Sequence, residues 1–73
     1  MGAGGVMPDF IVWGNGLQGE WQGSAASKHE AVAAYIAMKV DHARDHGLPD
    51  PGPYLRTWHL SDFTVTRAPK RRV

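Results

Sequence analysis

The sequence predicts a small α+β domain in which an antiparallel sheet packs one face against a single helix. Three observations support this fold class: an Asn-Gly hairpin signal after a short apolar run, one long helix with signals at both ends, and strand-forming residues near the C-terminus. The expected order is β-β-α-β, with a possible fourth short strand. The 73 residues leave room for one domain, which we place at residues 9–66, between a flexible leader at 1–8 and a basic flexible tail at 67–73.

The first two strands are predicted to form a hairpin. Residues 9–13 are rich in strand-forming side chains, and Asn15-Gly16 is a strong signal for a two-residue turn. With that turn, Phe10 pairs with Trp21. Successive side chains then alternate between the two faces of the hairpin. The apolar face carries Phe10, Val12, Leu17 and Trp21, and the polar face carries Gln18, Glu20 and Gln22.

The helix is predicted from residue 28 to His46. Ser27 and Glu30 match a capping box, in which the two side chains satisfy amides at the helix start. No Gly or Pro interrupts the segment. Gly47 suits the left-handed position that ends a helix, and Pro49 prevents continuation. The expected sheet-facing stripe has the spacing i, i+4, i+8 and i+11 and consists of Val32, Ile36, Val40 and Ala43.

The chain after the helix is predicted to run through a stiff connector into the last strand. Three prolines within residues 48–53 remove amide donors and exclude regular structure there. Residues 54–60 and 63–66 are typical of β-strand, and the intervening Ser-Asp pair is interpreted as a bulge or break.

The composition excludes several classes of protein. The chain has no cysteine, so disulfides, thiolate metal sites and cysteine nucleophiles are impossible, and a cytoplasmic location is favoured. A hydrophobic fraction of 42% is sufficient for a core, but no apolar run reaches the roughly 20 residues that a membrane span requires. The Ala-, Gly-, Arg- and His-rich composition resembles that of small proteins from actinobacteria or their phages, which is a resemblance of source alone. An accessory protein from such a source would fit a protein-binding role.

No catalytic residue, cofactor or metal site is predicted. His42 and His46 are spaced to share a metal ion, and His29 and His59 are the other imidazoles. Zinc requires three or four ligands, and the His-Glu-x-x-His pattern is absent. Histidines near a helix C-terminus also suit the helix dipole, so we interpret them as surface residues. No nucleophile motif is present, and the chain is therefore predicted not to be an enzyme.

The leading functional hypothesis is a protein-binding module. Ile11 and Trp13 fall on the otherwise polar face of the hairpin, with Glu20 beside them. Tryptophan is among the residues that most often anchor protein interfaces. The expected partner is another protein or a second copy of the chain. The alternative is that the leader or the proline-rich connector covers these side chains.

The second hypothesis is nucleic-acid binding. Residues 1–66 carry four basic and seven acidic residues, a net charge of −3, whereas residues 67–73 carry a net charge of +4. A basic tail can bind phosphates by releasing counterions, although it can equally be a solubilising end. One side of the helix, beside the expected apolar stripe, carries Tyr35 and two lysines, and it is a second candidate surface for binding phosphates. The residues assigned to this hypothesis are Lys28, Lys39, Arg67, Lys70, Arg71 and Arg72.

Overall fold

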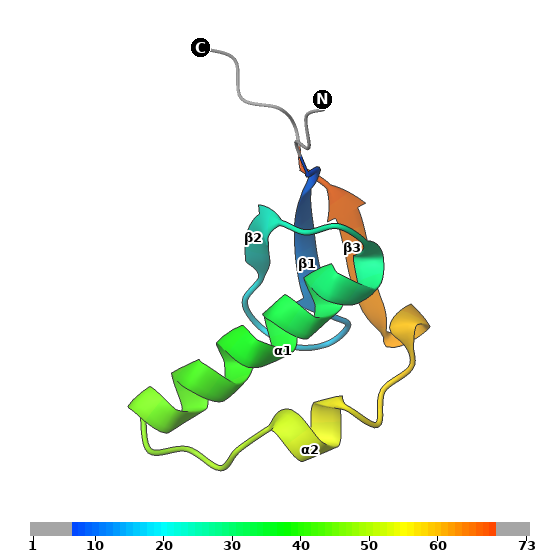
Figure 1. Cartoon of the computed structure of the whole chain (residues 1–73). Helices are drawn as coiled ribbons and strands as arrows, with labels where there is room; N and C mark the ends of the chain where they lie inside the picture. Colours follow the sequence, from blue (N-terminus) through cyan, green and yellow to red (C-terminus); the bar gives the residue numbers. More distant parts are fainter. Residues whose placement is uncertain (1–6, 69–73) are drawn as a thin grey trace.

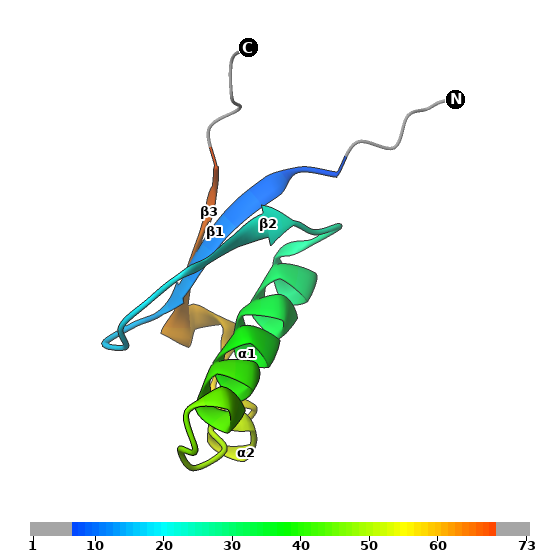
Figure 2. The same cartoon turned by 90° about the vertical axis from the view of Figure 1, so that its left-hand side faces the viewer.

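The computed structural model describes residues 7–68, which form a three-stranded antiparallel sheet covered on one face by helices (Figures 1 and 2). This confirms the predicted α+β class. The strands lie in the order β2-β1-β3, so β1 is central. The elements are β1 (Asp9–Gly14), β2 (Trp21–Ser24), α1 (Lys28–Asp45), α2 (Gly52–Leu55), the 3-10 turn η1 (Leu60–Asp62) and β3 (Phe63–Arg67).

The predicted register of the first two strands is wrong by two residues. Phe10 lies opposite Gly23, and Trp21 lies opposite Val12. A shift of one residue would move every side chain to the other face, but a shift of two restores each side chain to its own face. Phe10, Val12 and Trp21 therefore lie on the helix side, as predicted.

The register differs because the turn at Asn15 and Gly16 is of another type and is followed by a loop that runs to residue 20. The Leu17 amide donates to the Gly14 carbonyl at 2.9 Å, which closes a turn with Asn15 and Gly16 at its centre. Gly16 has a φ of 85°, but Asn15 has a negative φ, so the type I′ turn that predicts the shorter register does not form. Asn15 also forms hydrogen bonds with residues at the start of β3 and just before it. Its amide donates to the Asp62 carbonyl at 3.0 Å, and its side-chain oxygen accepts a hydrogen bond from the Thr64 hydroxyl at 2.6 Å.

Both ends of α1 are specified locally, as predicted. The Ser27 hydroxyl accepts a hydrogen bond from the Glu30 amide at 3.2 Å, while the Glu30 carboxylate accepts from the amide of the residue before the cap. At the other end, Gly47 has a φ of 66°. The Leu48 amide then reaches back to the Ala43 carbonyl at 2.8 Å, which closes a Schellman motif.

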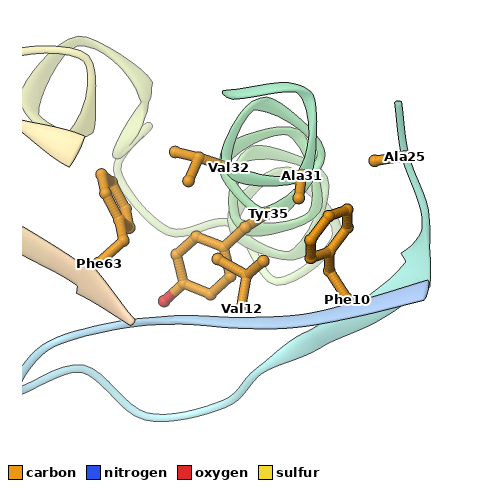
Figure 3. Packing of buried hydrophobic residues seen from close by; sticks show 7 residues of the cluster. All are labelled: Phe10, Val12, Ala25, Ala31, Val32, Tyr35 and Phe63. Atoms are coloured by element: carbon orange, nitrogen blue, oxygen red, sulfur yellow. The ribbon is translucent and has the colours of Figure 1, made fainter. Parts of the chain in front are cut away.

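The helix buries Val32 and Ala43 as predicted, but its buried stripe is centred on Tyr35. Tyr35 is fully buried, whereas Ile36 and Val40 are only partly buried. The Tyr35 ring packs edge-on against the Phe63 ring, with 5.9 Å between ring centroids. Because the ring is the largest apolar surface on the helix, it takes the central position despite its hydroxyl. The core cluster consists of Phe10, Val12, Ala25, Ala31, Val32, Tyr35 and Phe63 (Figure 3).

The predicted strand at 54–60 is also wrong, because the segment forms the end of α2 and the turns that follow it. Regular structure was excluded over 48–53, but α2 begins within that stretch at Gly52. Pro51 precedes α2, and its carbonyl accepts a hydrogen bond from the Leu55 amide at 2.9 Å. A proline at a helix start is favourable because its φ already suits the helix. The predicted strand at 63–66 is confirmed as β3, which pairs with β1. The residues between these segments form η1, and Arg67, assigned to the tail, is the last residue of β3.

The buried Tyr35 hydroxyl has no hydrogen-bond partner within residues 7–68. A buried unpaired hydroxyl costs about 1–3 kcal/mol. We therefore predict that Tyr35→Phe leaves the free energy of unfolding unchanged or raises it by about 1 kcal/mol, as measured by urea denaturation. Tyr35→Ala, which removes the ring as well, should cost about 3–5 kcal/mol. A loss above about 1 kcal/mol for Tyr35→Phe would contradict the absence of a partner.

Candidate functional site

The face of the sheet that points away from α1 carries the predicted apolar pair. Ile11 and Trp13 alternate with the inward-facing residues of β1, and both are partly buried. Trp13 also contacts the edge of the core cluster. Their neighbours across the strands are small or uncharged. We call this surface the open sheet face; it consists of Asp9, Ile11, Trp13, Gln22, Ser24, Thr64 and Thr66.

Of these seven residues only Asp9 is charged. Its carboxylate accepts a hydrogen bond from the Ser24 hydroxyl at 2.6 Å, at the end of the sheet remote from Trp13. The centre of the face, around Ile11 and Trp13, therefore presents apolar and uncharged polar side chains. The connector between α1 and α2 does not cover it, because the connector lies on the helix side of the sheet (Figure 2). Residues 1–6 of the predicted leader lie outside the described part of the chain.

Glu20 is not placed as the hairpin register predicted. It belongs to the loop before β2 and is exposed, because the ladder between β1 and β2 ends at the pair Val12 and Trp21. Gln22 occupies the position opposite Ile11 that was predicted for Glu20. The acidic group assigned to the site is therefore replaced there by an uncharged amide.

The cations assigned to nucleic-acid binding are not gathered by the described part of the fold. Lys28 and Lys39 are eleven residues apart on α1, which separates them by about 16 Å along the helix axis. The Lys39 ammonium donates to the Gln18 carbonyl at 2.5 Å. The Arg67 guanidinium lies 5.5 Å from the centre of the Phe10 ring. The remaining three cations, Lys70, Arg71 and Arg72, lie outside the described residues.

The histidine pair lies on the last turns of α1. The rings of His42 and His46 are 4.3 Å apart between centroids. Within residues 7–68 no group of three or more histidine or acidic side chains is placed to hold a metal ion. In the same range, no helix combines the length and the apolar composition that crossing a bilayer requires.

The structure also contains an apolar groove that the sequence did not indicate. It lies where the end of α1, the connector at residues 48–51, α2 and the loop after β1 meet. Its residues are far apart in sequence and follow no common periodicity, so no linear pattern marks them. We call it the connector groove; it is lined by Leu17, Lys39, His42, Ala43, Leu48, Pro49, Pro51, Tyr54 and Leu55.

Comparison of the chain with protein-family models, with curated proteins and with solved structures finds no match.

The hydrogen bond from Lys39 to Gln18 holds the loop at residues 15–20 against α1. We predict that Lys39→Met lowers the free energy of unfolding by about 0.5–1 kcal/mol, because the carbonyl loses a charged donor at an exposed site. Amide hydrogen exchange should quicken within this loop. Lys28→Met, on the same helix but exposed, is the matched control and should change stability by less than about 0.5 kcal/mol. Equal effects of the two substitutions would argue against this role of Lys39.

Proposed function

We propose that this chain is a small, non-catalytic, cytoplasmic protein-binding module that associates with a second copy of itself through the open sheet face. The observation that carries the proposal is the position of Ile11 and Trp13 on the central strand of a sheet that, within residues 7–68, is covered by helices on the other face alone (Figure 2). Tryptophan contributes large contact area at interfaces and is enriched among the residues that dominate binding energy. A sheet face that no described helix covers, with such a residue on its central strand, is suited to docking.

A second copy is the favoured partner because the face is close to neutral. Two-fold symmetry brings identical patches together, so a charge near the symmetry axis is opposed by its own copy. Here the centre has no charge to oppose, and Asp9 lies at one end. Two sheets can stack about 10 Å apart, with the side chains of their facing surfaces interdigitating. In this arrangement the indole of Trp13 would be covered in both copies.

The small size of the described domain supports association as well. A domain of about this size buries only about 60% of the surface that its unfolded chain exposes. Apolar area removed from water contributes about 25 cal/mol per Å². Covering the open sheet face would add to the burial that one helix provides on the other face.

We predict that the wild-type chain forms a dimer in sedimentation analysis over a wide concentration range and after nuclease treatment, and that Trp13→Ala is monomeric. Because Trp13 also contacts the core cluster, a second variant is needed. Thr66→Lys changes an exposed side chain of the open sheet face and places like charges near each other across the interface. It should dissociate the dimer without changing the circular dichroism spectrum.

The matched control is Ala33→Lys, which adds the same charge on an exposed position of α1, on the other side of the sheet. It should leave the dimer intact. A wild-type chain that is monomeric at every concentration overturns the proposal, and so does a Thr66→Lys variant that still dimerises. Assembly that disappears on nuclease treatment would point to nucleic acid instead.

A further inference from the structure

The connector groove collects most of the exposed apolar side chains. Five large hydrophobic residues are exposed within residues 7–68, and three of them line this one groove. These are Leu17, Leu48 and Tyr54, of which Leu48 is 54% and Tyr54 is 63% exposed. The floor is formed by buried side chains of Ala43 and Leu55. A concave apolar surface of this kind, rimmed by long side chains, is typical of a binding site.

The groove is held open by rigid elements. Pro49 and Pro51 fix the backbone of the connector on one side, and the Schellman motif at Leu48 fixes where the connector leaves α1. The Tyr54 ring is supported edge-on by Trp58, with 5.7 Å between ring centroids. A preformed site loses little conformational entropy when a partner binds, which favours affinity.

The size of the groove indicates what it can hold. Its volume is about 230 Å³, below the 300–1,000 Å³ range of sites for small-molecule ligands and cofactors. It suits a single large apolar side chain. Interface anchors of this type fill a pocket while the surrounding residues exclude water.

The rim of the groove carries one cation, the Lys39 ammonium, beside the imidazole of His42. Among the described residues no carboxylate lines it. The Lys39 ammonium gives one hydrogen bond to the Gln18 carbonyl, and an ammonium has three donors. The nearest acids along the chain do not line the groove. The Asp50 carboxylate accepts a hydrogen bond from the Gly52 amide at 2.8 Å, and Asp41 pairs with Arg44. Asp45 lies with Asp41 at a separate hollow beside Trp21. A carboxylate beside the apolar anchor would therefore meet a cation.

From these features we propose that the connector groove binds a peptide segment of another protein in which one large apolar side chain stands next to acidic residues. The apolar side chain enters the groove between Leu48 and Tyr54. A neighbouring carboxylate of the peptide accepts a hydrogen bond from the Lys39 ammonium. This site is separate from the open sheet face and does not depend on self-association.

The test is a selection of random displayed peptides against the full chain, with counter-selection against the double variant Leu48→Ser, Tyr54→Ser. Both positions are exposed, so the double variant should keep the fold, as checked by circular dichroism. The expected outcome is a set of peptides that share one aromatic or leucine residue flanked by acids. A synthetic peptide of this set should bind the double variant about tenfold more weakly or worse, as expected for loss of an anchor pocket.

Two controls distinguish peptide binding in the groove from nonspecific hydrophobic binding. The first control is Leu60→Ser. The Leu60 side chain is 38% exposed, similar to the groove residue Leu17 at 37%, but it does not line the groove. This substitution should leave the peptide affinity unchanged. Lys39→Met should weaken binding of the acidic peptide but not of its counterpart with glutamines in place of glutamates. This charge-specific difference would not arise from a merely structural effect of Lys39.

Several results would overturn the proposal. These are enrichment of no peptide, enrichment of peptides without acids, or equal binding to wild type and the double variant. Loss of dimerisation in the double variant together with failure of peptide selection would assign the groove to a second copy of the chain. Because Thr66→Lys and the groove variants change different surfaces, failure of one proposal is distinguishable from failure of the other.

Discussion

The packing of α1 against the inner face of β1 is the constraint on which the rest of the molecule depends. Tyr35 lies beside Val12 and Phe63 at the centre of this contact (Figure 3). Because side chains alternate along a strand, burying Phe10 and Val12 turns Ile11 and Trp13 toward the opposite face. A chain with one long helix covers only one side of its sheet. The open sheet face is thus a direct consequence of how the core is built.

The same helix also explains why a groove forms at its other end. Eighteen residues make α1 about 27 Å long, whereas the six residues of β1 span about 20 Å. The C-terminal turns of α1 therefore extend past the sheet (Figure 1). The connector and α2 return along these turns and bury Leu55 and Ala43. Their cover is incomplete, so Leu48 and Tyr54 remain exposed around a hollow.

Features encoded within a few neighbouring residues were predicted well from the sequence. The caps at Ser27 and Gly47 depend only on local backbone amides and carbonyls, so the bounds of α1 followed from them. The assignment of Phe10, Val12 and Trp21 to the helix side was also right, because strand alternation has a period of two and survives a two-residue shift. The third strand followed from its strand-forming residues.

Features set by contacts between distant residues were not predicted. Asn15 and Gly16 do form a turn, but Asn15 is bound to Asp62 and Thr64 and has a negative φ, so the type I′ geometry that sets the shorter register is not adopted. Tyr54 and Trp58 have strong strand propensity, but Tyr54 lies in α2 and its ring packs edge-on against Trp58, in the turn that follows the helix. Propensity is weak where tertiary packing acts in this way. The connector groove draws on four segments, so it exists only in three dimensions.

The two candidate surfaces lie on opposite sides of the sheet, and this separation has a physical consequence. A partner on the open sheet face contacts β1, β2 and β3 from the side that carries no helix (Figure 2). A peptide in the connector groove contacts α1, the connector and α2. The Lys39 ammonium at the groove donates a hydrogen bond to the Gln18 carbonyl in the loop after β1. An ammonium has three donors, so Lys39 can also bind a carboxylate of the peptide while it keeps the hydrogen bond to Gln18. Occupation of one surface therefore leaves the other accessible, and a dimer formed through the sheets would present two grooves facing outward, which would raise its affinity for a partner carrying two copies of the peptide.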